Sequence, residues 1–90
     1  MNRLDAIKAV REAVDRSETL TAREKRRIKA SVRWRPKVRA EVAGLVLAEA
    51  CVEGLVDEDG EVAAAIQWDQ ILSFIERLLP LILQLVSLFG

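Results

Sequence analysis

The chain has 90 residues, 51% of them hydrophobic and 31% charged, and its 14 Lys and Arg balance its 14 Asp and Glu. This composition is typical of one small folded domain and argues against a disordered segment. The chain has no His and one cysteine, Cys51. These counts exclude a zinc site, a Cys–His or Ser-His-Asp catalytic centre and an internal disulfide framework. A free cysteine is usually a small buried residue, so we expect Cys51 to be buried.

Three helices are predicted in the first half of the chain. Helical spacing of apolar residues predicts the first over 2–16, with Asn2 as its cap. Thr21 and Glu24 form a capping-box pattern, which predicts a second helix from there to about residue 32. Pro36 restricts the residue before it and suits the first position of a helix, so the third helix is expected to begin there. Gly54 is expected to follow its last turn in the left-handed conformation.

An acidic turn is predicted after the third helix, over 55–62, and it is compatible with a β-hairpin of two-residue arms. A calcium loop is excluded: with Gly60 as its sixth position, Leu55 and Ile66 would occupy the first and twelfth, which need oxygen ligands. The alanines in 63–68 favour helix, although the alternation of apolar residues there also fits extended chain. We expect helix, with Asp69 as a second position for its cap.

The stretch 71–89 is the most apolar part of the chain, with thirteen large apolar residues out of nineteen. Its polar residues and Pro80 recur mostly every three or four positions, which predicts a helix with one narrow polar stripe. Pro80 should bend this helix near Glu76–Leu79. The apolar surface exceeds what a small domain is expected to cover, so we predict an oligomer interface made by Phe74, Ile75, Leu78, Leu79, Ile82, Leu85, Val86 and Phe89.

Charge is strongly polarised along the chain. Residues 23–39 carry nine Lys and Arg and one Glu, a local net charge of +8, whereas 40–76 carry nine Asp and Glu and no Lys or Arg. The basic stretch can remain solvated or pair with the acidic region of the same or a neighbouring chain. It can also bind phosphates with Trp34 stacked on a base, which is less favoured because dispersed basic residues are a weak sign of nucleic-acid binding. The charges form no single row, which argues against sequence-specific readout. The predicted docking patch is Arg23, Arg26, Arg27, Lys29, Arg33, Trp34, Arg35, Lys37 and Arg39.

A membrane is the alternative partner for 71–89. The length of this stretch as a helix nearly matches the thickness of a hydrocarbon core. Glu76, Arg77 and Pro80, however, bring the free energy of inserting a single copy close to zero. Lying flat on a bilayer surface is easier, because the polar stripe can then stay in water. The first ten residues are too charged for a secretory signal peptide, so none is expected.

Three segments together resemble small helical accessory proteins of tailed-phage particles. They are the charged helix at 21–32, the turn at 54–60 and the apolar terminus ILSFIERLLPLILQLVSLF. The resemblance is one of type and transfers no individual residue. It implies a short non-enzymatic protein that associates in symmetric clusters on or within a shell or tail.

We therefore expect an all-α bundle of four helices forming one folding unit. Residues 1–62 would be an amphipathic helical part with the acidic turn, and 63–90 an apolar oligomerisation helix. The predicted function is that of a non-enzymatic structural or assembly protein that self-associates and docks on a larger assembly, without catalytic residues, cofactor or metal. The alternatives are a small membrane-active protein acting through 71–89 and a non-specific nucleic-acid-binding protein acting through 23–39. The expected location is a virion or the bacterial cytoplasm.

Overall fold

Four α-helices follow one another in the computed structural model, which describes residues 1–89. They are α1 (Arg3–Arg16), α2 (Ala22–Trp34), α3 (Pro36–Val52) and α4 (Trp68–Leu88). The described residues contain no β-strand, so the predicted all-α class with four helices is confirmed. Gly90, the last residue of the predicted second part, lies outside the described residues.

The first two helices begin with the predicted caps. Asn2 Oδ1 accepts the amide of Asp5 at 2.8 Å, and Thr21 Oγ1 accepts the amide of Glu24 at 3.1 Å. The carboxylates of Asp5 and Glu24 reach back to the amides of Asn2 and Thr21 at 3.3 and 2.9 Å. Each cap therefore satisfies amides that the first helical turn leaves without partners, as a capping box does.

The start and end of α3 also follow from local sequence. Pro36 is its first residue, and Arg35 before it is extended, with φ −120° and ψ 96°. Gly54 has φ +76°, its amide donates to the Cys51 carbonyl at 3.1 Å, and the Leu55 amide donates to the Ala50 carbonyl at 2.9 Å. This hydrogen-bond pair is the Schellman ending, and it confirms the predicted role of Gly54.

The expected helix over 63–67 is wrong. Val56 and Val62 form one antiparallel bridge, and the Ala63 amide donates to the Leu55 carbonyl at 3.0 Å. This bond commits the Ala63 amide to the loop, and the chain turns again before α4 begins at Trp68. The alanine content favours helix, but here tertiary pairing of the loop outweighs that weak local preference.

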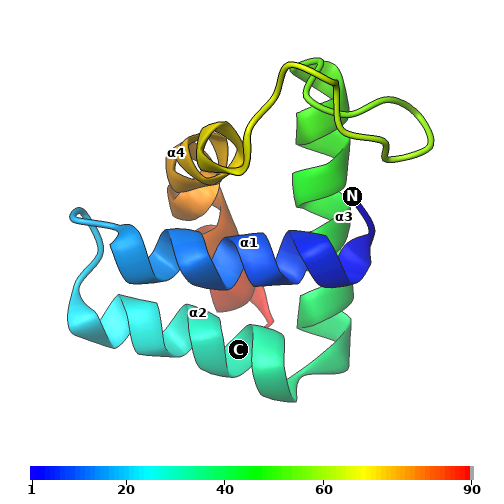
Figure 1. Ribbon diagram of the computed structural model, residues 1–90. Helices are drawn as coiled ribbons and strands as arrows, with labels where there is room; N and C mark the ends of the chain where they lie inside the picture. The colour runs from blue at the N-terminus through cyan, green and yellow to red at the C-terminus, as the bar shows by residue number, and fades with distance from the viewer. Residues whose placement is uncertain (90) are drawn as a thin grey trace.

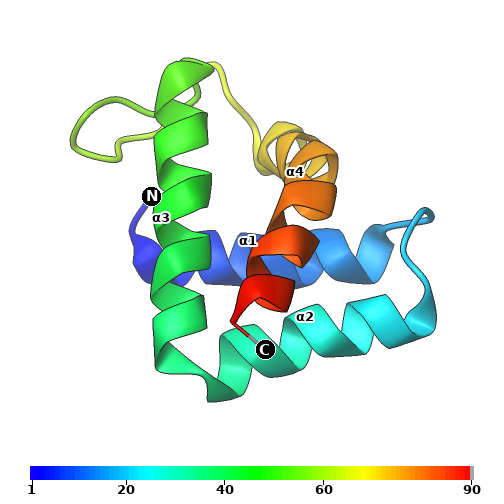
Figure 2. The same ribbon diagram turned by 180° about the vertical axis from the view of Figure 1, so that it is seen from behind.

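Figures 1 and 2 show how the helices are arranged. The antiparallel helices α1 and α2 lie side by side, α3 stands across one end of the pair, and α4 packs against α1 from behind. Each helix contacts the other three. The Cα radius of gyration is 12.2 Å, and about 12 Å is expected for a compact domain of this length. None of the four helices therefore projects as a free arm.

The core lies where the four helices meet. Its largest fully buried side chains include Ile28 of α2 and Ile75, Leu79 and Ile82 of α4. Burial of one such side chain stabilises the fold by about 1.5–3 kcal/mol. The α1 helix contributes a row of small residues that lets its backbone approach α3 and α4 closely, namely Ala6, Ala9 and Ala13.

Cys51 is exposed, so its expected burial is wrong. The inner side of α3 carries Val42, Val46 and Ala50. Successive residues of a helix are rotated by about 100°. Cys51, next after Ala50, therefore lies outside the buried stripe, and Val52 is 81% exposed beyond it.

Candidate functional site

The junction between α2 and α3 displays a compact group of basic and aromatic side chains. Only Arg35 links the two helices, because Pro36 forces it out of the helical conformation. Trp34 is consequently held at the end of α2 with 71% of its surface exposed. We call this group, with the neighbouring end of α4, the basic–aromatic corner: Arg33, Trp34, Arg35, Lys37 and Phe89.

The corner is organised by two contacts. The guanidinium carbon of Arg33 lies 4.8 Å from the centroid of the Trp34 ring, within the range of a cation–π interaction. Arg35 donates a hydrogen bond from Nη2 to the carbonyl of Phe89, which ties the end of α4 to the α2–α3 junction. Residues that are far apart in the sequence thus share one surface.

An open hollow lies at this corner. Its volume is about 510 Å³, and Trp34, Arg35, Pro36, Lys37, Val38 and Phe89 line it. Both aromatic side chains remain solvent-accessible, Phe89 at 38%. The first turn of α3 has no side-chain hydrogen-bond cap within residues 1–89 and contains Lys37 in place of an acidic residue, so the local potential is positive.

The basic stretch is not neutralised by the acidic region of the same chain. Within the described chain its one ion pair joins Lys29 Nζ to Asp15 at 2.7 Å, and Asp15 belongs to α1. Arg39 Nη1 donates to the Arg33 carbonyl at 3.3 Å instead of to a carboxylate. The internal pairing of 23–39 with 41–69, one of the expected options, therefore does not occur among residues 1–89.

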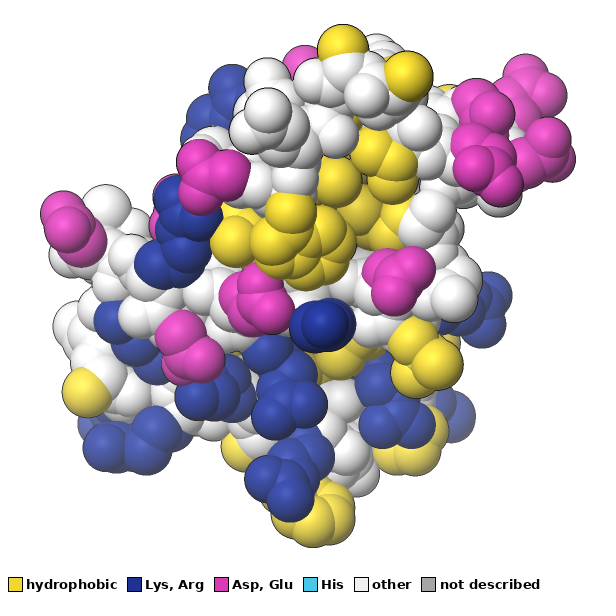
Figure 3. All heavy atoms as spheres, viewed as in Figure 1, with side chains coloured by type: hydrophobic (Ala, Val, Ile, Leu, Met, Phe, Trp, Pro, Cys, Tyr) yellow, Lys and Arg dark blue, Asp and Glu magenta, His cyan; other side chains and the backbone are white. Residues whose placement is uncertain are grey.

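The predicted docking patch divides into two parts. Arg33, Trp34, Arg35 and Lys37 belong to the corner, with Arg39 half-buried beside them. The other members continue along α2 toward the α1–α2 loop: Arg23, Arg26, Arg27 and Lys29. Lys and Arg side chains spread over the lower part of the face drawn in Figure 3, where α1 and α2 lie.

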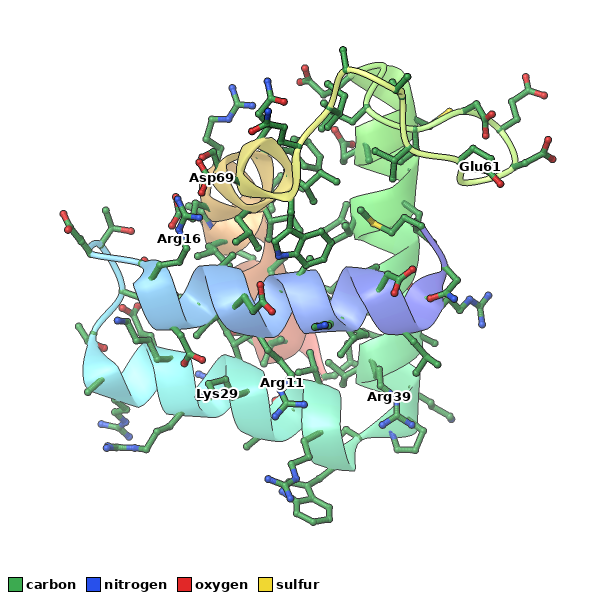
Figure 4. The ribbon with its side chains drawn as sticks, viewed as in Figure 1. Arg11, Arg16, Lys29, Arg39, Glu61 and Asp69 are labelled. Atoms are coloured by element: carbon green, nitrogen blue, oxygen red, sulfur yellow. The ribbon has the colours of Figure 1, made fainter. Side chains whose placement is uncertain are left out.

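The acidic loop occupies the opposite end of α3. Asp57 Oδ1 accepts the amides of Asp59 and Glu61, both at 2.9 Å, which holds the loop in a tight turn. Figure 3 shows Asp and Glu clustered where this loop projects, and Figure 4 labels Glu61 on it. The length of α3, roughly 25 Å at 1.5 Å per residue, separates the acidic loop from the basic–aromatic corner.

The predicted oligomer interface is corrected by the burial of α4. Six of its eight residues lie in the core of the single chain, each at most 9% exposed: Phe74, Ile75, Leu78, Leu79, Ile82 and Val86. The physical reason is that α1, α2 and α3 together cover the broad apolar face that a single small helix could not. Leu85 is half-buried and Phe89 exposed, so these two remain accessible.

A narrower apolar stripe remains on the outer flank of α4. Leu81 is 50% exposed and Leu88 is 83% exposed, with the half-buried Leu85 between them. The spacing i, i+4, i+7 places the three leucines on one side of the helix. We call them the leucine flank.

An ion-pair cluster that sequence reasoning missed joins α1 to α4. Arg16 Nη1 lies 2.7 Å from Asp69 Oδ1 (Figure 4), and Arg16 Nε lies 3.1 Å from Glu76 Oε1. The hydrogen bond with Asp69 is the main cause of a raised pKa of Arg16; desolvation opposes it, and the charges of Asp69 and Glu76 add to the rise. An open hollow of about 500 Å³ lies beside the cluster, lined also by residues of the α1–α2 loop.

Comparisons with known proteins add no relative, since no family model, curated protein or solved structure matches this chain.

Proposed function

We propose that this chain is a non-enzymatic structural or assembly protein that associates with copies of itself and docks on a larger assembly such as a phage capsid or tail. The leucine flank supports self-association, because Leu81 and Leu88 remain exposed although eight other side chains of α4 are buried in the core. The observation that carries the proposal is this stripe of three leucines, which lies on one side of a helix whose other side is already packed in the core of the same chain.

The size of the stripe sets the strength of association. A stable protein interface buries about 800 Å² on each partner, more than three leucine side chains provide. We therefore expect weak pairing of free copies, which strengthens when an assembly holds several copies near one another.

Two finer structural expectations belong to this proposal. Pro80 lies inside α4 and lacks the amide that would bond to the Glu76 carbonyl, so a bend near Glu76–Leu79 remains our prediction. Such a bend sets the direction of the leucine flank relative to the core. A hairpin with two-residue arms at 55–62 is the second expectation, and it would present the acidic loop as a rigid projection.

The test is the mass of the chain in detergent-free solution, measured by light scattering after size exclusion over a series of concentrations. The unmodified chain should gain mass as concentration rises. Leu81→Asp combined with Leu88→Asp should remain monomeric, whereas Leu4→Asp should associate normally, since Leu4 is 79% exposed on α1. A chain that stays monomeric at every concentration contradicts self-association.

A membrane-active role is the second candidate. By length and composition α4 can cross a membrane, and an 18-residue window of it has mean hydropathy 1.8 with 39% of the window buried. Insertion would remove eight buried side chains from the core of this fold, so it requires α4 to leave α1, α2 and α3. Flotation with neutral and anionic liposomes decides between the candidates, because an assembly protein with a packed α4 should remain with the unbound fraction.

A further inference from the structure

The basic–aromatic corner combines features that few partners can satisfy at once. Trp34 offers an exposed ring with Arg33 over one of its faces, and Phe89 lies on the same hollow. Arg35 and Lys37 also line this hollow. Large exposed aromatic side chains grouped with cations are uncommon on a monomer surface and mark interaction sites. The matching ligand must present a flat apolar ring next to negative charge.

The acidic loop of a second copy meets only half of this requirement. Its side chains from Asp57 to Glu61 are carboxylates interrupted by Gly60. They can neutralise the cations, but they provide no ring to cover Trp34 or to fill the apolar part of the hollow. A nucleotide chain provides both parts, since every unpaired base has a stacking face and every link carries a phosphate.

The arrangement of charge further indicates an unpaired strand. Stacking on Trp34 requires a base that is free of its complementary partner, which excludes an intact duplex at this position. The basic side chains lie on both sides of Trp34 in the sequence and continue along α2 through exposed Arg26 and Arg27, without forming one row that could enter a groove. Binding of this kind follows the backbone and is insensitive to base sequence.

We propose that the basic–aromatic corner binds single-stranded nucleic acid without sequence preference, with one base stacked on Trp34 and the flanking phosphates on Arg33, Arg35 and Lys37. The Arg35 bond to the Phe89 carbonyl holds the end of α4 beside the stacked base. This proposal rests on other residues than the leucine flank, and the two surfaces adjoin where Phe89 follows Leu88 at the end of α4.

The experiment uses the full chain carrying Trp68→Phe, so that Trp34 is the remaining tryptophan of the two. Single-stranded oligothymidylate and oligouridylate are titrated while the fluorescence of Trp34 and the anisotropy of a labelled strand are measured. Both strands should quench Trp34 and bind with similar affinity. Three phosphate contacts predict a slope of about −2 for log affinity against log salt, at about −0.7 per contact.

Variants separate stacking from general charge. Trp34→Ala should weaken binding by about 5- to 150-fold, the range measured for loss of one base-stacking aromatic, and Trp34→Phe should restore most of it. Arg33→Gln combined with Lys37→Gln should reduce the salt slope by about 1.4. Arg77→Gln, an exposed arginine outside the hollow, serves as the matched control and should leave affinity and slope nearly unchanged.

Four results would overturn the proposal. The first is absence of quenching by either strand at low salt, and the second is binding that Trp34→Ala leaves intact. The third is a duplex that binds more tightly than the strands. The fourth is stronger quenching by a peptide of residues 55–62 or by anionic vesicles, which would assign the corner to a second copy or to a lipid surface.

Discussion

Replacing Ile75 by Ala tests whether α4 is a core helix of the single chain. Ile75 is 0% exposed, and truncation of a fully buried isoleucine costs about 2–5 kcal/mol, the lost transfer energy plus the cavity left behind. Domains of this size have total stabilities of about 5–15 kcal/mol. The loss is therefore a large fraction of the whole, and it should lower the melting temperature by at least about 8 °C.

Leu88→Ala is the matched control on the same helix. Leu88 is 83% exposed, so this truncation should change the free energy of unfolding by no more than about 0.5 kcal/mol. Urea unfolding followed by circular dichroism at two protein concentrations gives the change in the free energy of unfolding for each substitution. Because the core contacts of Ile75 lie within one chain, its cost should not depend on protein concentration. Equal effects of the two substitutions, or a cost of Ile75→Ala that disappears on dilution, would refute the assignment of α4 to the monomer core.

Two further perturbations probe the loop and the ion-pair cluster. Gly60→Ala should destabilise the fold more than Gly54→Ala in thermal unfolding. Both glycines have positive φ, but a Cβ at Gly60 would lie 2.5 Å from the Met1 carbonyl oxygen, whereas a Cβ at Gly54 would meet open space. The strain common to both is about 1–2 kcal/mol, and equal losses would contradict the close approach of Met1. Arg16→Gln should lower stability at low salt more than Lys29→Gln, since Arg16 pairs with two carboxylates and Lys29 with one. The difference should shrink as added salt screens these partly exposed pairs, and a salt-independent difference would count against an electrostatic origin.

Local features of the fold could be predicted from sequence because their causes lie within a few residues. The caps at Asn2 and Thr21, the helix start at Pro36 and the ending at Gly54 each depend on one side chain or one backbone preference. These preferences act on neighbouring amides and carbonyls, so their spacing in the sequence is enough to locate them.

The partner of α4 could not be predicted in the same way. Periodicity gives the width of its apolar face but does not say what covers that face. Ile75 and Leu79 are covered by helices whose own apolar stripes are narrow, and the combined cover depends on how three helices are placed in space.

Two other features of the site depend on long-range placement. Arg16 meets Asp69 and Glu76 across separations of 53 and 60 residues, and no sequence spacing signals such a pair. The candidate corner was predicted in part: Trp34 and its basic neighbours are local in the sequence, whereas the arrival of Phe89 beside them is a property of the folded chain.

The exposure of Cys51 gives the molecule a natural chemical handle. It is the one thiol in the chain and lies in the last turn of α3, at the end opposite the basic–aromatic corner. A maleimide dye can therefore be attached at a single site, roughly 25 Å from Trp34 along the helix. That spacing suits energy-transfer measurements of docking, and the reporter neither touches the residues that it observes nor requires an introduced cysteine. In air the same thiol can link two copies covalently, so measurements of mass should be made under reducing conditions.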